Sequence, residues 1–376
     1  MKTKVVVAMS GGVDSSVAAH LLVEQGYEVI GLFMRLGIDK LDSTTKTKIC
    51  CSLEDANDAR TVADQLGIQF HILNFKDAFN SIIDTFCNEY LNGRTPNPCI
   101  LCNQELKFGR LLDFARMLNA DFIATGHYAR VEKPKERYLL KKGTDSRKDQ
   151  SYVLFSLNQD QLSRTLFPLG TTNKESVREV AQNLNLKTKD KPESQDICFV
   201  LDNNYHSLLH ERFGNLITPG ILKDTQGNIL GRHPGIPFFT IGQRKGLGVA
   251  LGTPRYVVDI SPQENTVVIG TDKELMEDEL VASTLNWISL DTIHSPIEVQ
   301  AKIRYNHIPT PAIVYPCGID KVRVVFHEPQ RAITPGQAVV FYDNDTVVGG
   351  GWIERKSGKA FSPHLKPPLS SPQIDF

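Results

Sequence analysis

The sequence predicts an α/β protein with an N-terminal doubly wound parallel sheet, a small central loop-rich domain and a C-terminal β-barrel. Strand-like and helix-like segments alternate through the first part of the chain, which favours a parallel sheet. Glycine and proline become frequent after residue 201, and short alternating strands follow from about residue 275. We expect domains at 1–200, 201–274 and 275–355, then a proline- and serine-rich tail at 356–376 that is disordered.

The expected elements follow from hydrophobic periodicity. In the first domain we expect strands at 5–9, 28–34, 68–75 and 121–128, and helices at 17–25, 53–66, 76–90 and 104–118. Further on we expect a helix at 177–184 and barrel strands at 299–305, 321–327, 338–342 and 346–353, the last two joined by a turn at 343–345. Ligands of a parallel sheet bind at the C-terminal ends of its strands.

A glycine-rich turn, Ser10-Gly11-Gly12-Val13-Asp14-Ser15-Ser16, lies between the first strand and the first helix. Backbone amides and the helix dipole make such a turn an anion site, and the serines offer hydroxyl donors. The pattern GxxxxGK[ST] is absent, so the turn favours pyrophosphate over a γ-phosphate grip. The alternative is an ordinary strand-to-helix turn, with Asp14 or Ser15 as the helix N-cap.

Charge and composition limit the class of protein. The formal net charge is −1, so any RNA surface has to be local, and residues 133–150 offer a basic segment that could equally be a solvated loop. No apolar run approaches a membrane span, and the short lead into the first strand leaves no room for a signal peptide. Seven cysteines are too sparse for a disulfide scaffold. We therefore expect a reducing, cytoplasmic setting.

Two groups of cysteines stand in informative contexts. Cys99 and Cys102 form a C-x-x-C pair that opens a helix, where the helix N-terminus lowers a thiol pKa. Half a zinc site, a redox pair and a nucleophile with a bystander all fit this spacing. Cys198, between Ile197 and Phe199, looks locally like a small buried hydrophobe. Cys50, Cys51, Cys87 and Cys317 lack such contexts, and we expect them to be structural.

Six ordered motifs give the chain a specific resemblance. They are SGGVDSS, NPC-x-x-CNxxxKFG, ATGHYAR, KDQSYVLF, SQDICFV and FTIGQRKGLG. Together they resemble the tRNA-specific 2-thiouridylases, PP-loop ATP-pyrophosphatases, from residue 4 to about residue 355. The resemblance implies a PP-loop domain, a small central domain and a barrel like those of translation elongation factors. It also implies adenylation of O2 of the tRNA wobble uridine, followed by sulfur transfer from a cysteine persulfide with release of AMP and pyrophosphate.

The resemblance implies roles for particular residues. Cys198 would carry the persulfide, and Cys102 would be the nucleophile that releases the sulfur and leaves a Cys102–Cys198 disulfide. The implied ATP-binding residues are Ala8, Met9, Ser10, Gly11, Gly12, Val13, Asp14, Ser15, Met34 and Gly126. Asp14 would either help to hold Mg²⁺ or cap the helix. The implied partners are tRNA and a persulfide-donating relay protein or cysteine desulfurase, and we expect a monomer.

The implied tRNA contacts are Asn97, Pro98, Cys99, His127, Lys148, Asp149, Gln150, Arg304, Tyr305 and Gln337. Neighbours in a regular strand point to opposite faces, so a shared RNA-facing role for Arg304 and Tyr305 implies a bulge or a strand end. Structural roles for Tyr305 in the barrel core and for His127 at a strand end stay open. Some family members carry Asp at the position of Cys99, so Cys99, Cys102 and Cys198 together offer three thiolates to an iron–sulfur cluster. We favour a metal-free thiolate mechanism.

Two other functions stay open at this point. One is another ATP-pyrophosphatase, such as an amidotransferase-type synthetase or a tRNA-lysidine synthetase, which needs no paired cysteines. The other is a tRNA-binding module with a relict nucleotide site, which the intact glycine-rich turn argues against.

Overall fold

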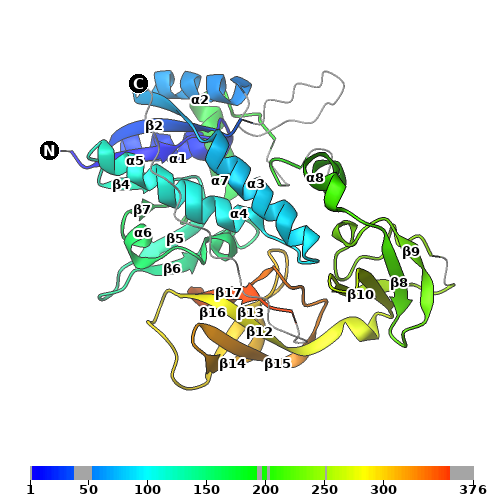
Figure 1. Ribbon diagram of the computed structural model, residues 1–376. Coiled ribbons are helices and arrows are strands. Elements are labelled where there is room, and N and C mark those ends of the chain that lie inside the picture. Colours follow the sequence, from blue (N-terminus) through cyan, green and yellow to red (C-terminus); the bar gives the residue numbers. More distant parts are fainter. Residues whose placement is uncertain (1, 38–52, 193–196, 201–203, 250–251, 356–376) are drawn as a thin grey trace.

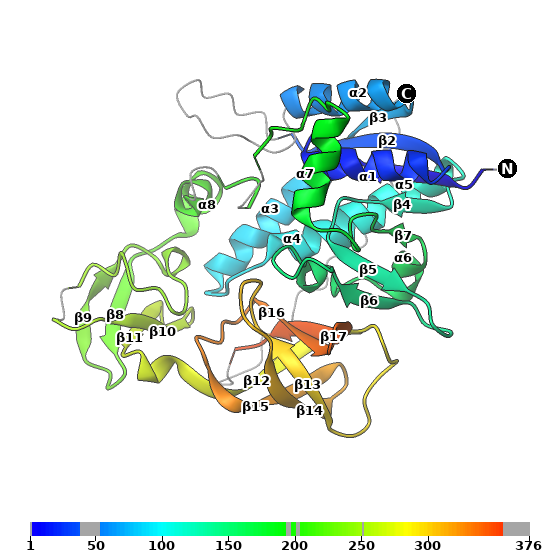
Figure 2. The same ribbon diagram turned by 180° about the vertical axis from the view of Figure 1, so that it is seen from behind.

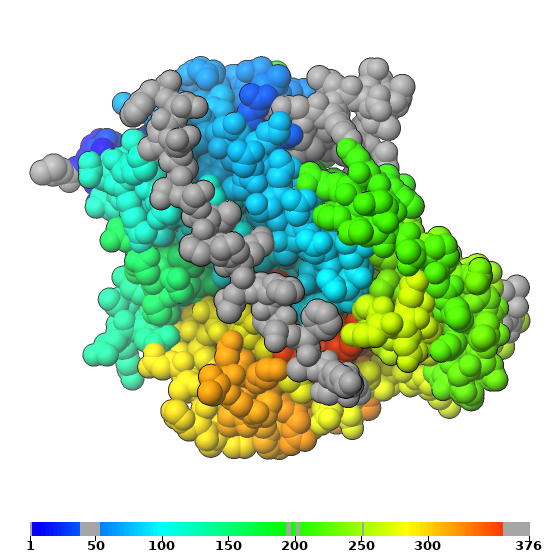
Figure 3. All heavy atoms as spheres, viewed as in Figure 1, coloured from blue at the N-terminus to red at the C-terminus, as the bar shows by residue number. Residues whose placement is uncertain are grey.

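The computed structural model describes residues 2–37, 53–192, 197–200, 204–249 and 252–355. Cys50, Cys51 and the expected tail at 356–376 lie outside the described residues. The described chain forms three sheets, which lie in three parts of the molecule that contact one another (Figures 1 and 3). No described helix is long and apolar enough to cross a membrane.

The first sheet is parallel and has five strands in the order β3-β2-β1-β4-β7. These are β1 (Lys4–Ala8), β2 (Glu28–Arg35), β3 (Gln69–Asn74), β4 (Phe122–Ala124) and β7 (Thr165–Leu166). The main helices around it are α1 (Val13–Glu24), α2 (Leu53–Leu66), α3 (Lys76–Leu91), α5 (Leu111–Met117), α6 (Gln159–Ser163) and α7 (Lys174–Asn183). The predicted doubly wound parallel sheet is confirmed, with β4 shorter than the predicted 121–128.

Alternation along β1 explains why helices cover both faces of this sheet. Val5 and Val7 are fully buried in one core with residues of α1, α2 and α7. Val6 and Ala8 point to the opposite core, which includes Leu111 of α5. Both faces are therefore apolar, as expected for a buried parallel strand. The strand order reverses between β1 and β4, and such a switch point is where doubly wound sheets bind ligands.

The central part follows α8 (Tyr205–Phe213) and contains four strands in the order β10-β11-β8-β9. They are β8 (Gly220–Asp224), β9 (Ile229–His233), β10 (Tyr256–Ser261) and β11 (Thr266–Gly270). The sequence prediction of a small loop-rich domain missed these strands, because the segments are short and separated by glycine and proline turns.

The C-terminal part is a closed barrel of six strands, in which β12 pairs with both β15 and β17. The strands are β12 (Met276–Trp287), β13 (Ile297–Lys302), β14 (Thr310–Gly318), β15 (Lys321–Arg331), β16 (Ala338–Asp343) and β17 (Thr346–Ile353). The predicted barrel and the turn between β16 and β17 are confirmed, with Asn344 in the left-handed region at φ 54°. β13 ends at Lys302, before the Tyr305 that the alternation pattern included.

A hairpin from the N-terminal half extends the barrel sheet. It consists of β5 (Ala129–Glu132) and β6 (Leu139–Lys142), and β6 pairs with β17 (Figures 1 and 2). Lys141 and Arg130 form ion pairs with Asp345, and Arg137 pairs with Asp291. The basic segment at 133–150 is therefore not simply a solvated loop, because part of its charge joins the two halves of the chain.

Candidate active site

The glycine-rich turn connects β1 to α1 in a conformation that requires glycine. Gly11 has φ +72°, and a Cβ there would lie 2.3 Å from the backbone oxygen of Asp55. Gly12 is the N-cap of α1, so the predicted capping by Asp14 or Ser15 is wrong. Among the described residues no side chain bonds to the α1 N-terminus as a cap. Its first-turn amides can therefore receive an anion.

The serines of the turn mostly hold the turn itself. Ser15 Oγ donates to the Gly12 carbonyl at 3.2 Å and accepts from the Ser10 amide at 3.1 Å. Ser16 Oγ donates to the same carbonyl at 2.8 Å, and the residue is fully buried. Of the three predicted hydroxyl donors, only that of Ser10 belongs to an exposed residue. The hydroxyls of Ser15 and Ser16 therefore shape the turn and leave the backbone amides to contact a ligand. We call this turn, with the residues on either side of it (8–15), the cradle.

The other residues implied for ATP binding lie around the same strand ends. Gly126 follows β4, and a Cβ there would lie 2.8 Å from both the Asp14 carbonyl carbon and the Ser15 amide nitrogen. This close approach presses the loop after β4 against the first turn of α1. Met34 lies near the end of β2 and is half-buried. The fold thus gathers Ala8, Gly11, Met34 and Gly126 at one edge of the sheet, at its switch point.

Asp14 is held by two residues that the sequence analysis did not identify. The Lys174 ammonium lies 2.7 and 2.8 Å from its two carboxylate oxygens, and the Tyr128 hydroxyl donates to Oδ1 at 2.7 Å. Lys174 is buried, being 6% exposed. An acidic residue in the turn predicts a cation near it. The sequence did not show which cation this is, because Lys174 is a single lysine at the start of α7, far from Asp14 in the chain.

The two cysteines with implied catalytic roles share one apolar environment. Cys99 lies in α4 (Pro98–Leu101), and Cys102 begins the π-helix η1 (Cys102–Arg110). Cys102 and Cys198 both pack against the inter-domain core, which we define by Phe79, Phe86, Phe199, Leu209 and Val257 and their buried neighbours. The two residues, far apart in sequence, thus border the same core. Both side chains are thiols in the structure, and neither forms a disulfide.

Burial dominates the chemistry of the Cys102 thiol. Its pKa is raised by burial, and the Lys107 ammonium only partly opposes that shift. The predicted lowering of a thiol pKa at this helix N-terminus is therefore wrong for Cys102, because desolvation outweighs the helix dipole. A π-helix is rare and often marks a functional segment. Among the described residues, no group of three His, Cys, Asp or Glu side chains is arranged to hold a metal.

His127 lies at the end of β4 and is buried. Its Nδ1 is 2.7 Å from the Thr125 hydroxyl, and Phe108 and Phe167 pack beside the ring. Burial, reinforced by the Lys107 charge, lowers its pKa well below the usual value. The imidazole is therefore neutral at pH 7 and offers hydrogen bonds, not charge.

The segment implied to contact tRNA at 148–150 also ties the N-terminal half together. Asp149 accepts from the Gly143 and Ser151 amides, each at 3.1 Å. The Gln150 side chain accepts from the Tyr128 amide at 3.0 Å. Gln150 thereby supports the residue that holds Asp14.

The barrel residues implied to contact tRNA differ in exposure. Arg304 and Tyr305 follow β13, which ends at Lys302, so the alternation that predicted a strand through Tyr305 is wrong at this end. Tyr305 is 38% exposed and its hydroxyl donates to the Asp149 carbonyl at 3.3 Å, so it is not a barrel-core residue. Arg304 points inward, donating to the Ala332 carbonyl at 2.6 Å and to the Thr334 hydroxyl. Gln337 donates to the carbonyls of Thr95 and Pro96.

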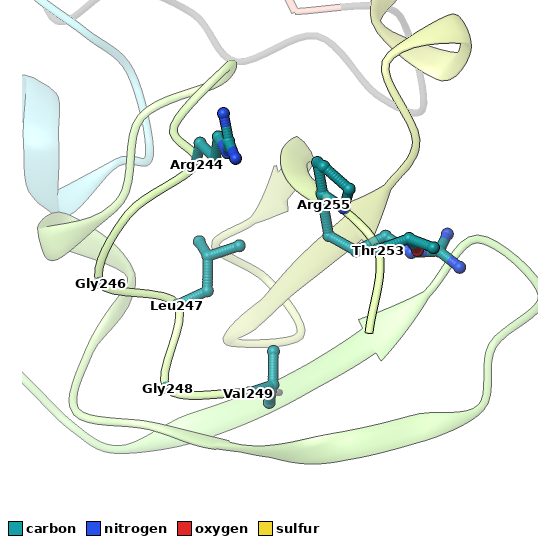
Figure 4. A pocket seen from close by; sticks show the side chains of 8 residues that line it. Arg244, Gly246, Leu247, Gly248, Val249, Thr253 and Arg255 are labelled. Atoms are coloured by element: carbon teal, nitrogen blue, oxygen red, sulfur yellow. The ribbon is translucent and has the colours of Figure 1, made fainter. Parts of the chain in front are cut away.

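The FTIGQRKGLG motif lies in the central part. Arg244 and Leu247 of this motif, with Thr253 to Arg255, line a cavity of about 450 Å³ (Figure 4). Leu247 also belongs to the inter-domain core against which Cys102 and Cys198 pack.

The fold and the cradle together define a class of protein: an α/β protein with a doubly wound parallel sheet and a glycine-rich turn at its switch point, extended by two β-domains. A family model described as tRNA methyl transferase HUP domain matches residues 3–202. Models described as tRNA methyl transferase PRC-barrel domain and Aminomethyltransferase beta-barrel domain match residues 207–271 and 277–353.

Full-length relatives identify the particular family. The chain is 55% identical over 359 residues to tRNA-specific 2-thiouridylase MnmA of Carboxydothermus hydrogenoformans, covering 94% of this chain and 98% of the relative. It is 52% identical over 356 residues to tRNA-specific 2-thiouridylase MnmA 2 of Clostridium botulinum and 50% identical over 358 residues to MnmA of Clostridioides difficile, again covering 94% of this chain and at least 99% of each relative. The chain belongs to the tRNA-specific 2-thiouridylase family.

Proposed function

We propose that this protein is an ATP-dependent tRNA-uridine 2-sulfurtransferase that replaces O2 of the wobble uridine by sulfur. The observation that carries the proposal is the pairing of an anion cradle at a switch point with two separated cysteines on one core. A synthetase of the same superfamily needs the cradle but not the cysteines. The relatives named above support the same substrate and reaction.

ATP would bind with its pyrophosphate in the cradle from Ala8 to Ser15, between Met34 and Gly126. First-turn amides of α1 supply preorganised donors for the leaving pyrophosphate. O2 of the uridine attacks the α-phosphorus of ATP, and pyrophosphate leaves. The oxygen on C2 then departs as part of AMP, which is a better leaving group than an oxide. Mg²⁺ would accompany the phosphates, and Asp14 would reach it only by exchanging its contact with Lys174.

Sulfur would arrive as a persulfide on Cys198. Its terminal sulfur attacks C2 of the adenylated uridine and AMP leaves. The Cys102 thiolate then attacks the Cys198 sulfur, which breaks the persulfide bond and leaves a Cys102–Cys198 disulfide that a thiol reductant must reopen. The shared apolar core supports this pairing because it excludes water from a reactive sulfur. We do not propose an iron–sulfur cluster, since the described cysteines form no metal-binding group with other ligands.

tRNA would lie across the N-terminal half and the barrel. Asn97, Pro98 and Cys99 border the thiol of Cys102, and neutral His127 could hydrogen-bond an uncharged base edge. Lys148 and the exposed ring of Tyr305 offer charge and stacking to RNA. A base must leave its stack before C2 can react. We further propose a cytoplasmic monomer that takes persulfide from a relay protein or a cysteine desulfurase.

The test is nucleoside mass spectrometry of unmodified tRNA incubated with Mg-ATP and a persulfide donor. Wild type should form 2-thiouridine with stoichiometric AMP and pyrophosphate, and Cys198→Ser should form none. Cys317→Ser is the matched control, because that cysteine is exposed and lies at the end of β14 in the barrel. ATP cleavage without thiouridine in the wild type would favour a synthetase, and equal thiolation by Cys198→Ser would remove Cys198 from the mechanism.

A further inference from the structure

The loop that leads to the catalytic cysteines has little secondary structure of its own. It runs from Asn92 to Asn97, between the end of α3 and the start of α4. Residues 94–97 belong to no helix or strand. Buried backbone amides and carbonyls in such a segment need partners from elsewhere. In both views the loop region between α3 and α4 lies directly over the barrel (Figures 1 and 2).

The barrel supplies those partners. The Thr95 amide donates to the Pro335 carbonyl at 2.8 Å. The Gln337 side-chain amide donates to the Thr95 carbonyl at 2.9 Å and to the Pro96 carbonyl at 3.2 Å. The Arg355 guanidinium donates to the Asn92 and Gly93 carbonyls, both at 3.1 Å. The loop is thus held by residues from the far end of the chain.

The contact is also sterically close. Gly336 has φ +90°, and a Cβ there would lie 3.0 Å from both the amide nitrogen and the carbonyl oxygen of Thr95. Pro335 and Gly336 are buried. The segment 332–336 is held from behind by the half-buried Arg304, which donates to Ala332 and Thr334. The part of the barrel that contacts the loop is therefore itself held in place by hydrogen bonds.

We propose that Gln337 is a positioning residue for the catalytic cysteines, acting through the Thr95 and Pro96 carbonyls. Its amide fixes the segment that ends at Pro98, the first residue of α4, one turn before Cys102. With its side-chain amide directed at backbone carbonyls of its own chain, Gln337 has little donor capacity left for RNA. Its effect on catalysis rests on the proposed function, whereas its effect on the loop does not.

The loop itself can be tested in the ligand-free protein. Gln337→Met keeps the side-chain length and removes both donors. We expect iodoacetamide to alkylate Cys102 at least about fivefold faster in this variant, as followed by peptide mass spectrometry, because each lost hydrogen bond shifts local opening by about that factor and two are lost. Gln300→Met, on the exposed face of β13, is the matched control and should leave the rate unchanged. Equal Cys102 alkylation in wild type and Gln337→Met would overturn the proposal.

The catalytic consequence separates positioning from RNA contact. At saturating tRNA, Gln337→Met should lower the single-turnover thiolation rate roughly tenfold or more while the Kd for tRNA stays within about twofold of wild type. A raised Kd with a normal saturating rate would make Gln337 an RNA contact and contradict the proposal. If Gln337→Met does not fold, Gln337→Asn, which keeps the amide one methylene short, should show the same changes at smaller size. If wild type forms no thiouridine, the proposed function fails, and the alkylation rates still decide the role of Gln337.

Discussion

The cradle and the loop that leads to Cys99 and Cys102 (residues 92–97) lie in the same half of the chain, but different contacts hold them. The cradle is held by residues of the N-terminal half, since Ser15 and Ser16 donate to the Gly12 carbonyl and Lys174 binds Asp14. The cysteine loop is shaped by the barrel, through Gln337, Pro335 and Arg355. The proposed adenylation can thus rest on contacts within the N-terminal half, whereas the proposed sulfur transfer depends on assembly of the whole chain.

The sharpest test of how the cradle is held is Gly11→Ala. The positive φ and the approach of the Asp55 carbonyl both oppose a side chain, so we expect about 3 kcal/mol loss of stability and loss of ATP binding. Gly26→Ala is the control: its φ is +85°, but a Cβ would meet nothing within 4 Å, so only about 1 kcal/mol should be lost. Urea denaturation measures the stability of both variants, and ATP titration measures the binding. Equal losses would mean that the Asp55 contact does not constrain the turn.

A smaller effect should come from the one distant ion pair described for the cradle. Asp14→Asn removes the carboxylate that lies 2.7 Å from the buried Lys174 ammonium. Removing one partner of a fully buried pair costs about 3–5 kcal/mol, but the Asp14 side chain is 33% exposed, so we expect about 2 kcal/mol. Adding Lys174→Met should recover most of that loss, as measured by urea denaturation. A double variant no more stable than Asp14→Asn would show that the loss of this ion pair is not the cause.

The smallest effect concerns Cys102 in η1. The Lys107 charge lowers the pKa of the Cys102 thiol against the dominant effect of burial. Lys107→Met should therefore raise that pKa, reduce the thiolate fraction at pH 8 and slow alkylation of Cys102 about threefold. The pH profile of alkylation should move to higher pH. A profile that stays in place would mean that Lys107 does not act on this thiol; Lys133→Met, in the β5–β6 hairpin, is the control.

The same contrast explains what could be predicted from sequence. The cradle has a contiguous signature, so its place between strand and helix, its glycines and the parallel sheet followed from local pattern. Helix α2 was predicted at its observed bounds, because its apolar positions repeat at helical spacing. Alternation also indicated the barrel, although it extended β13 to Tyr305, whereas the strand ends at Lys302. The pattern could not show that end, because the chain leaves the sheet there without a glycine or proline to mark it.

Other features left no local trace. The sequence could not show that Lys174 neutralises Asp14, because the two lie 160 positions apart. Nor could it show that burial governs the Cys102 pKa, since that depends on the inter-domain core. Spacing alone did not bring Cys102 and Cys198 together; only the family resemblance implied it. Arg304 and Gln337 fitted an RNA contact by resemblance, and only the structure placed their donors on backbone carbonyls.

The proposed adenylation and the proposed sulfur transfer depend on different parts of the chain. The most direct test of this is tRNA-dependent exchange of labelled pyrophosphate into ATP. It is measured for wild type and for a double variant that carries Cys102→Ser and Cys198→Ser. We expect the double variant still to exchange pyrophosphate at a rate near wild type while forming no 2-thiouridine. Loss of exchange in a folded double variant would contradict it, because adenylation would then depend on the cysteines.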